Sequence, residues 1–197
     1  MAAPYLHDEV KHPFISAAPI ALDVFDRSGG PASGREPAVC STVASGELAG
    51  ELDGAADFLG VQVEEILLAA LGRTFGRTRG DGAVHVGVHG PSASRTVTLL
   101  CAASWPMGPS EMLQGAHNAM TAPATDVAAP AEVALGVDAA GRASEAALEV
   151  RVHRGDDGLR LEWLYDPARL DGYSVEEMAE QFPLALIEIT SDAGVPL

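Results

Sequence analysis

Alternation of apolar and polar residues indicates that several short stretches of this chain are strands. It predicts one strand over residues 39–44 and another over 84–88. The second strand has an apolar face and a polar face, formed by Val84, Val86 and Val88 and by His85, Gly87 and His89. Residues 96–103 are more continuously apolar, which predicts a strand in a buried position. A further short strand is expected over 132–137.

The clearest hairpin lies near the C-terminal end of the sequence. Residues 147–152 and 159–165 both alternate, and Gly155-Asp156-Asp157-Gly158 between them has the composition of a tight turn. The two stretches are therefore expected to pair as antiparallel strands.

Apolar residues recur at helical spacing in four stretches, 47–58, 62–75, 110–120 and a terminal helix that begins at Ser174. Ser110 is expected to cap the third helix. A capping box is expected for the fourth, which a proline should kink near its middle. Ser174 and Glu177 would form the capping box, and Pro183 is the expected site of the kink. The buried face of this helix is expected to hold Val175, Met178, Phe182, Leu184 and Leu186.

The organisation that follows is an irregular arm over residues 1–36, one mixed α and β domain over 37–192, and a tail over 193–197. Four prolines interrupt the arm, within which residues 20–25 could form a short strand. The arm is expected either to pack against another chain or to be an ordinary loose terminus. The strands are not regularly interleaved with helices, and there is no internal repeat.

Composition indicates a globular protein, because 47% of the residues are hydrophobic and 20% are charged. No apolar run is long enough to span a membrane, and the first ten residues lack the pattern of a secretory signal. A cytoplasmic location without membrane association is therefore expected. The formal net charge of −16 would repel a phosphate backbone, so nucleic acid is not an expected partner. The densest basic stretch, Arg73 to Arg79, suits the dipole at a helix end.

Several stretches have a recognisable order. Residues 60–71 include the first part of the second predicted helix, and the strand after that helix ends in His89-Gly90. Ala103-Ser104-Trp105-Pro106 follows the next strand, residues 159–166 read L-x-L-x-W-x-Y-D, and Ser174-Val175-Glu176 opens the last helix. In this order the stretches resemble the C-terminal half of a condensation domain of the nonribosomal peptide synthetases.

The resemblance implies a fold of the α/β (α+β) class, a single chloramphenicol-acetyltransferase-like lobe with a mixed sheet and flanking helices. In that family two such lobes form a V, and the substrates meet in a tunnel between them. Catalysis depends on a His-His-x-x-x-Asp-Gly motif in the N-terminal lobe, whose second His faces both substrates. On this resemblance Trp105 lies on the tunnel side, and His89 and Ser104 border it.

The sequence departs from the family in having no His-His pair, and residues 1–36 cannot supply a second lobe. The stretch from Val152 through His153 to Gly158 matches the motif except for its first His, but it lies between two alternating strands, where Asp-Asp-Gly favours a turn. Pro91 also stands where the family often has Arg. These losses argue against a standard peptide-bond-forming tunnel.

Other chemical signals are weak. His85 and His89 lie four residues apart, two positions along the same strand face, and could bind a metal, but no third ligand is evident, and a polar strand face explains them better. Cys40 and Cys101 are expected to be buried thiols rather than a disulfide or metal site. No phosphate-binding loop is present. No cofactor and no metal are therefore expected.

Three hypotheses remain open. The leading one is a truncated condensation-like accessory protein of nonribosomal peptide or related specialised-metabolite biosynthesis. It would act by associating with itself as a homodimer, or with a synthetase, carrier or tailoring protein, through a partly apolar lobe face. The second is a small cyclase or acyltransferase that uses candidate residues His89, Ser104 or His153. The third is a degenerate fragment without a present function.

Overall fold

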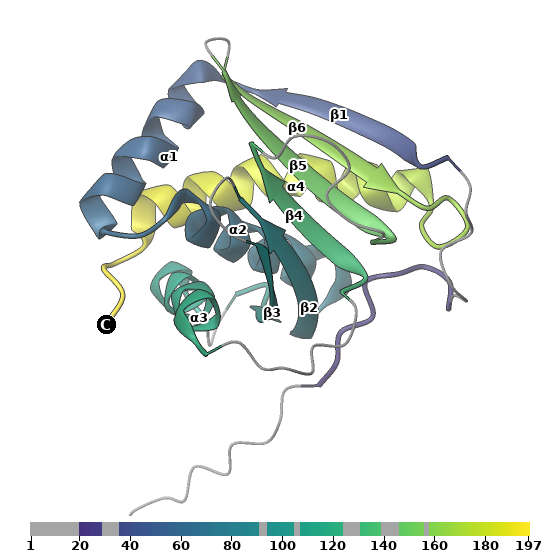
Figure 1. The fold of residues 1–197 in the computed structure, drawn as a ribbon, viewed down its shortest axis with the longest axis horizontal. Coiled ribbons are helices and arrows are strands. Elements are labelled where there is room, and N and C mark those ends of the chain that lie inside the picture. Colours follow the sequence, from purple (N-terminus) through teal and green to yellow (C-terminus); the bar gives the residue numbers. More distant parts are fainter. Residues whose placement is uncertain are drawn as a thin grey trace, which may run out of the picture.

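The computed structural model describes residues 20–28, 36–90, 94–104, 107–123, 131–138, 146–155 and 158–197. Within these ranges one mixed sheet and four helices form the fold (Figure 1). The strands are β1 (Ala38–Ala44), β2 (Gly82–His89), β3 (Ser94–Cys101), β4 (Val133–Val137), β5 (Leu148–Gly155) and β6 (Gly158–Tyr165). The helices are α1 (Gly46–Leu59), α2 (Val63–Arg79), α3 (Pro109–Thr121) and α4 (Gly172–Asp192).

The strand order across the sheet is β1-β6-β5-β4-β2-β3. The pairs β1–β6, β5–β6 and β2–β3 are antiparallel, whereas β4 pairs parallel to both β2 and β5. The outer strands are therefore β1 and β3. This arrangement confirms the expected mixed sheet with flanking helices.

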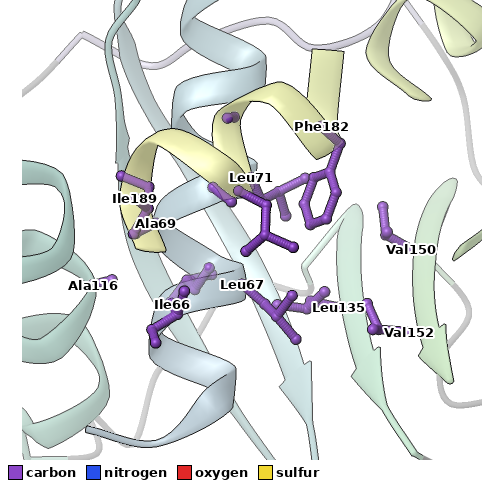
Figure 2. Packing of buried hydrophobic residues seen from close by; sticks show 14 of the residues in the cluster. Ile66, Leu67, Ala69, Leu71, Ala116, Leu135, Val150, Val152, Phe182 and Ile189 are labelled. Atoms are coloured by element: carbon purple, nitrogen blue, oxygen red, sulfur yellow. The ribbon is translucent and has the colours of Figure 1, made fainter. Parts of the chain in front are cut away.

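The core lies between the sheet and α2, which is buried on all sides from Glu65 to Gly76. Both α2 and α4 run behind the sheet in Figure 1, and α3 and α1 pack against them. Figure 2 shows the aliphatic side chains of α2 between the strands and α4. The largest buried side chain, Trp163 of β6, meets Phe182 of α4 edge to face at 5.9 Å between ring centroids.

Two glycines let α2 approach the end of β3 closely. A Cβ atom at Gly72 would lie 2.5 Å from the carbonyl oxygen of Leu100, and one at Gly76 would lie 2.1 Å from the carbonyl carbon of Ala102. Any larger residue at Gly76 would therefore force the helix away from the backbone beyond β3.

Arg73, the first arginine of the basic stretch at the end of α2, is buried and has a structural role beyond the helix dipole. Its side chain is only 1% exposed, and it donates hydrogen bonds of 2.8 Å to the carbonyl oxygens of Ala102 and Met107. Its guanidinium also lies 3.2 Å from the carboxylate of Glu188 in α4, and Arg77 contacts the same carboxylate. This arginine fixes the segment after β3 to two helices.

The described part of the N-terminal arm packs on its own domain. Ala21 forms an isolated parallel bridge with Ala83 of β2, and Val24 is buried. Asp26 then accepts hydrogen bonds from Arg79, from the Ser174 hydroxyl and from the backbone N–H of Asp171 at the start of α4. The short strand considered for residues 20–25 is thus reduced to one bridge, because β4 pairs with the rest of this edge of β2.

The predicted strands are confirmed, with one difference in position. Residues 96–103 were expected to be buried, but β3 covers Ser94–Cys101 and is an edge strand. Its last residues are apolar because α2 and α3 cover that end, not because strands flank it on both sides. The hairpin of β5 and β6 is confirmed, with Gly155 opposite Gly158.

Three details of the helices differ from expectation. α3 begins at Pro109 after Gly108, so Ser110 lies in its first turn and instead accepts a hydrogen bond from the N–H of Gly194. α4 begins at Gly172, and Ser174 bonds Asp26 rather than starting a capping box. Leu184, assigned to the buried face, is 54% exposed. No helix in the described ranges has both the length and the apolar character needed to cross a bilayer.

Candidate functional site

One face of the sheet carries none of the described helices, and polar and ionisable side chains from several strands lie on it; it is called the open face below. Alternation along each strand sends one residue in two to this face, opposite the buried core positions. The registers of the sheet place these residues side by side. They include Val39, Ser41 and Val43 on β1; Arg160, Glu162 and Leu164 on β6; Glu149, Arg151 and His153 on β5; Ala134 and Gly136 on β4; His85, Gly87 and His89 on β2; and Ser94, Thr96 and Thr98 on β3.

Two histidines of β2 each meet a hydroxyl of β3. The Oγ of Ser94 lies 2.5 Å from Nδ1 of His89, its direct cross-strand neighbour. The Oγ1 of Thr98 lies 3.2 Å from Nδ1 of His85 in the same way. The other nitrogen of the His89 ring lies over Gly87, where a Cβ atom would be only 3.2 Å away. The absence of a side chain at Gly87 therefore leaves room for this ring orientation.

The second cluster lies on the β5–β6 hairpin. Glu149 is only 3% exposed although it belongs to the open face, and its carboxylate accepts bonds of 2.8 and 3.3 Å from the guanidinium of Arg151. Further along the hairpin, Nε2 of His153 lies 3.6 Å from the carboxylate of Glu162. A shallow pocket next to the turn is lined by Val43, His153, Arg154, Gly155, Gly158, Leu159 and Arg160.

The structure separates the candidate catalytic residues from one another. His89 lies at one end of the β2–β3 hairpin and Ser104 follows its other end, so the length of β3 puts them roughly 20 Å apart. β4 lies between the strands of His89 and His153, which places the two strands about 10 Å apart. Trp105 lies outside the described residues. The three described candidates therefore do not form one constellation.

His153 occupies a regular strand position directly opposite Arg160. The register of the hairpin leaves two residues, Asp156 and Asp157, between its paired glycines, and both lie outside the described residues. A hairpin at this point agrees with the interpretation of the Asp-Asp-Gly stretch as turn chemistry.

The thiols are poor nucleophiles in this fold. Burial, followed by the nearby charge of Asp81, raises the pKa of Cys101 to about 12. Burial and the charge of Glu176 also raise the pKa of Cys40, which is half-buried. Within the part of the chain that the structure describes, no three His, Cys, Asp or Glu side chains are placed to hold a metal ion. The His85 and His89 pair lacks a third ligand there.

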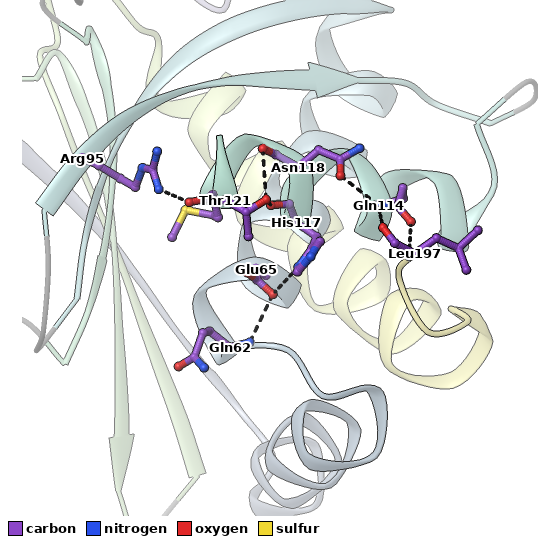
Figure 3. A network of polar contacts seen from close by, with 9 residues as sticks. Gln62, Glu65, Arg95, Gln114, His117, Asn118, Thr121 and Leu197 are labelled. Atoms are coloured by element: carbon purple, nitrogen blue, oxygen red, sulfur yellow. Dashed lines mark hydrogen bonds and ion pairs between the residues drawn. The ribbon is translucent and has the colours of Figure 1, made fainter. Parts of the chain in front are cut away.

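A polar network joins α2 and α3 on the other side of the sheet (Figure 3). Glu65, 4% exposed, accepts a bond from the N–H of Gln62 and lies 3.3 Å from Nδ1 of His117. Gln114 holds the C-terminal residue, accepting from the N–H of Leu197 at 2.7 Å. These contacts fix α3 and the chain end, and their geometry indicates a structural role.

Sequence reasoning missed the partners on the open face. Ser94 and the ion pair of Glu149 and Arg151 were not among the predicted site residues. The signal that could have found Ser94 is the hairpin register, since the pairing of β2 with β3 sets His89 against it. Glu149 and Arg151 are two apart on one strand, which already places them on the same face.

Comparisons with known proteins identify the fold. No family model matches the chain, and no curated protein matches it significantly. Among solved structures, the epimerization domain from the third module of tyrocidine synthetase B is similar with a TM-score of 0.69 and 12% identity. That likeness covers 89% of this chain and 52% of the other.

Two further structures agree. A complex of the X-domain and OxyB from teicoplanin biosynthesis is similar with a TM-score of 0.66 and 16% identity over 92% of this chain and 51% of the other. The first condensation domain of the calcium-dependent antibiotic synthetase, with a substrate analogue bound, has a TM-score of 0.61 and 19% identity over 91% of this chain and 49% of the other. The chain has the fold of one half of these domains and spans about half their length.

Proposed function

We propose that this chain is a condensation-like accessory lobe that works in nonribosomal peptide or related specialised-metabolite biosynthesis by binding another protein. The observation that carries the proposal is the pairing of this half-domain fold with a sequence that contains no His-His pair. The residue on which the family's condensation depends is not among these 197 residues, whereas their fold offers a scaffold for contacts. A cytoplasmic location and the absence of a cofactor remain predictions.

The surface also supports binding. Leu184 and Ile187 lie one turn apart on α4 and are 54% and 45% exposed, and Tyr173 at the start of the same helix is 86% exposed. Large apolar side chains exposed on one element are typical of a protein contact. The open face itself is mostly polar, so the partly apolar contact surface expected of this lobe is better supplied by α4. We therefore place the partner contact on α4.

The neighbours suggest the class of partner. One of them is an X-domain in complex with OxyB, and others are domains or larger parts of peptide synthetases. By this likeness we propose a synthetase, a carrier protein or a tailoring enzyme as the bound protein.

The experiment is capture with the tagged chain from source cells, followed by binding measurements with the purified candidate. Two results together support the proposal. A synthetase component or tailoring enzyme is recovered in near-equal amount and binds the purified chain, and the double substitution Leu184→Asp with Ile187→Asp weakens this binding at least tenfold. Val195→Asp is the matched control, because Val195 is 60% exposed but lies beyond α4. A chain that binds no synthetase component, carrier or tailoring enzyme contradicts it.

A second candidate, a small acyltransferase or cyclase, is favoured by one observation. The 2.5 Å contact between Ser94 and His89 is the geometry in which an imidazole can take a proton from a hydroxyl. If this pair is catalytic, Ser94→Ala and His89→Ala each abolish an activity that Thr98→Ala leaves intact. Equal activity in all three variants removes this candidate.

A further inference from the structure

The outer edge of β1 differs from ordinary strand edges in composition. Its seven residues, Ala-Val-Cys-Ser-Thr-Val-Ala, include no charge and no proline. Among the described strands β2 and β4 also lack Asp, Glu, Lys and Arg, but both lie inside the sheet. Val39 and Val43 are 57% and 70% exposed on the open face. An uncharged, β-branched edge is a template for pairing with another strand, which proteins usually block.

The hairpin fixes which backbone groups of β1 point outward. Because two residues separate Gly155 from Gly158, these glycines must form a hydrogen-bonded pair that exchanges both backbone bonds. Hydrogen-bonded positions alternate along β6, so Leu159, Leu161 and Trp163 direct their backbone groups to β1.

Their partners on β1 are Ala44, Thr42 and Cys40. The residues between them therefore turn their N–H and C=O groups away from β6, toward the free edge. These are Val39, Ser41 and Val43, the same residues whose side chains are exposed on the open face. No other strand in the described part of the chain pairs with this edge.

The sequence of β1 is also close to self-complementary when it is read in reverse. If two copies lie antiparallel about Ser41, Ala38 faces the partner's Ala44, and Val39 faces the partner's Val43. Cys40 then faces the partner's Thr42, a side chain of similar size, and Ser41 faces its own copy. In this register outward residues meet outward residues, so each free N–H finds a free carbonyl.

We propose that two copies of this chain pair through β1 in this register and form one sheet that continues across both. The second copy is the occupant because its edge offers the matching pattern of backbone groups and side chains. The absence of charge on β1 favours contact at this point of a chain whose net charge is −16. Pairing through β1 does not depend on which protein α4 binds.

The first test is the mass of the purified chain in solution by sedimentation over a range of concentrations. We expect a dimer of twice the 20.3 kDa chain mass. Ser41→Pro should raise the dissociation constant roughly tenfold or more, because it removes the two central N–H donors of the interface. The monomer tolerates this change because the N–H of Ser41 does not bond β6.

Ser41→Lys should also favour the monomer, since it sets two like charges directly opposite each other. Thr98→Lys is the matched control, an exposed position on the other edge strand that should leave the dimer intact. An unchanged circular dichroism spectrum and Tm for each variant show that the fold is kept. A wild-type chain that stays monomeric at every concentration overturns the proposal, as does a dimer that none of the β1 variants weakens.

The second test is the register. Ser41→Cys should form a disulfide between copies under mild oxidation, because the two Cα atoms of a directly opposite hydrogen-bonded pair lie about 5.5 Å apart. Val43→Cys should not, since position 43 faces position 39 and the two copies of residue 43 lie more than about 10 Å apart. Cross-linking at 43 but not at 41 overturns this register. Because these tests use the purified chain alone, their failure is separate from a failure to find a partner for α4.

Discussion

The two edges of the sheet are protected to very different degrees. β3 carries Arg95, whose guanidinium donates to the carbonyl oxygens of Met120 and Ala122 at the end of α3, and α2 and α3 cover its far end. β1 carries no charge, and its exposed valines lie on the face without helices. One edge is closed by contacts within the chain, and the other has the properties of an interface.

Hydropathy alone does not identify an interface in this fold. β3 is the more apolar strand toward its end, with Leu99, Leu100 and Cys101, yet it is the edge that the chain covers by itself. β1 is one residue shorter and contains no leucine, but its Val39 and Val43 stay exposed and its pattern matches its own reverse. Exposure and a self-complementary pattern therefore distinguish the two edges better than hydropathy does.

The largest effect is expected from Arg73, which binds the segment after β3 to α2 and α4. Arg73→Ala would leave the carbonyl groups of Ala102 and Met107 and the carboxylate of Glu188 without this partner, in a site where the arginine is 1% exposed. We expect a loss of about 3 kcal/mol in the free energy of unfolding, measured by urea denaturation.

Arg77→Ala is the control for that prediction, because Arg77 contacts the same Glu188 from a more exposed position. It should cost less than about 1 kcal/mol. Equal effects of the two variants would contradict the view that the buried arginine closes the β3 side.

The next effect concerns the arm beside β2. Burial alone would raise the pKa of Asp26, but hydrogen bonds from Asp171, Arg79 and Ser174 hold this pKa below its ordinary value of 3.8. A group with a lowered pKa stabilises the fold above that ordinary value, and the contribution is lost as the pH falls through the folded pKa.

Asp26→Asn should therefore cost about 2 kcal/mol at pH 7 and markedly less at pH 3, in paired urea titrations of both proteins. The arm should also become more open to protease in this variant at neutral pH. A difference between the two proteins that stays constant down to pH 3 would show that the carboxylate charge is not what holds the arm.

A smaller effect is expected at the protected edge itself. Arg95→Ala should lower the free energy of unfolding by about 1 kcal/mol, since it removes a cation and two donors from the C-terminal end of α3. Amide exchange should increase at the last turn of α3 and along β3, while β1 keeps its wild-type rates. Faster exchange at β1 in this variant would mean that the two edges are coupled.

The smallest effect uses the one cysteine that each edge strand carries. Cys101 is 2% exposed with a pKa raised to about 12, so a thiol reagent at pH 8 should not modify it in the folded protein. Cys40 is half-buried with a raised pKa, so it should react slowly. Mass spectrometry after timed labelling should find the first adduct on Cys40, and labelling of Cys101 first would reverse the comparison.

The strands and helices could be predicted from the sequence because their periodicities are local. The position of each strand in the sheet could not, since the burial of Val97 and Leu99 has the same pattern whether strands or helices supply the cover. Leu184 was misassigned because it lies near the boundary of the helical face, next to Pro183. His89 could be recognised as a candidate, but its partner Ser94 depends on the register of β2 and β3.

The order of the chain adds a consequence for synthesis and folding. β1 is made first, but the strand that it pairs with, β6, follows more than a hundred residues later. At ordinary ribosomal rates β1 waits on the order of ten seconds before its inner edge can be covered. Such a long-range pairing is also slow to form in the released chain. During that interval both sides of an uncharged strand are open, and neighbouring nascent chains present the same strand. A low density of ribosomes on each messenger RNA, together with prompt chaperone binding, should therefore raise the yield of folded protein.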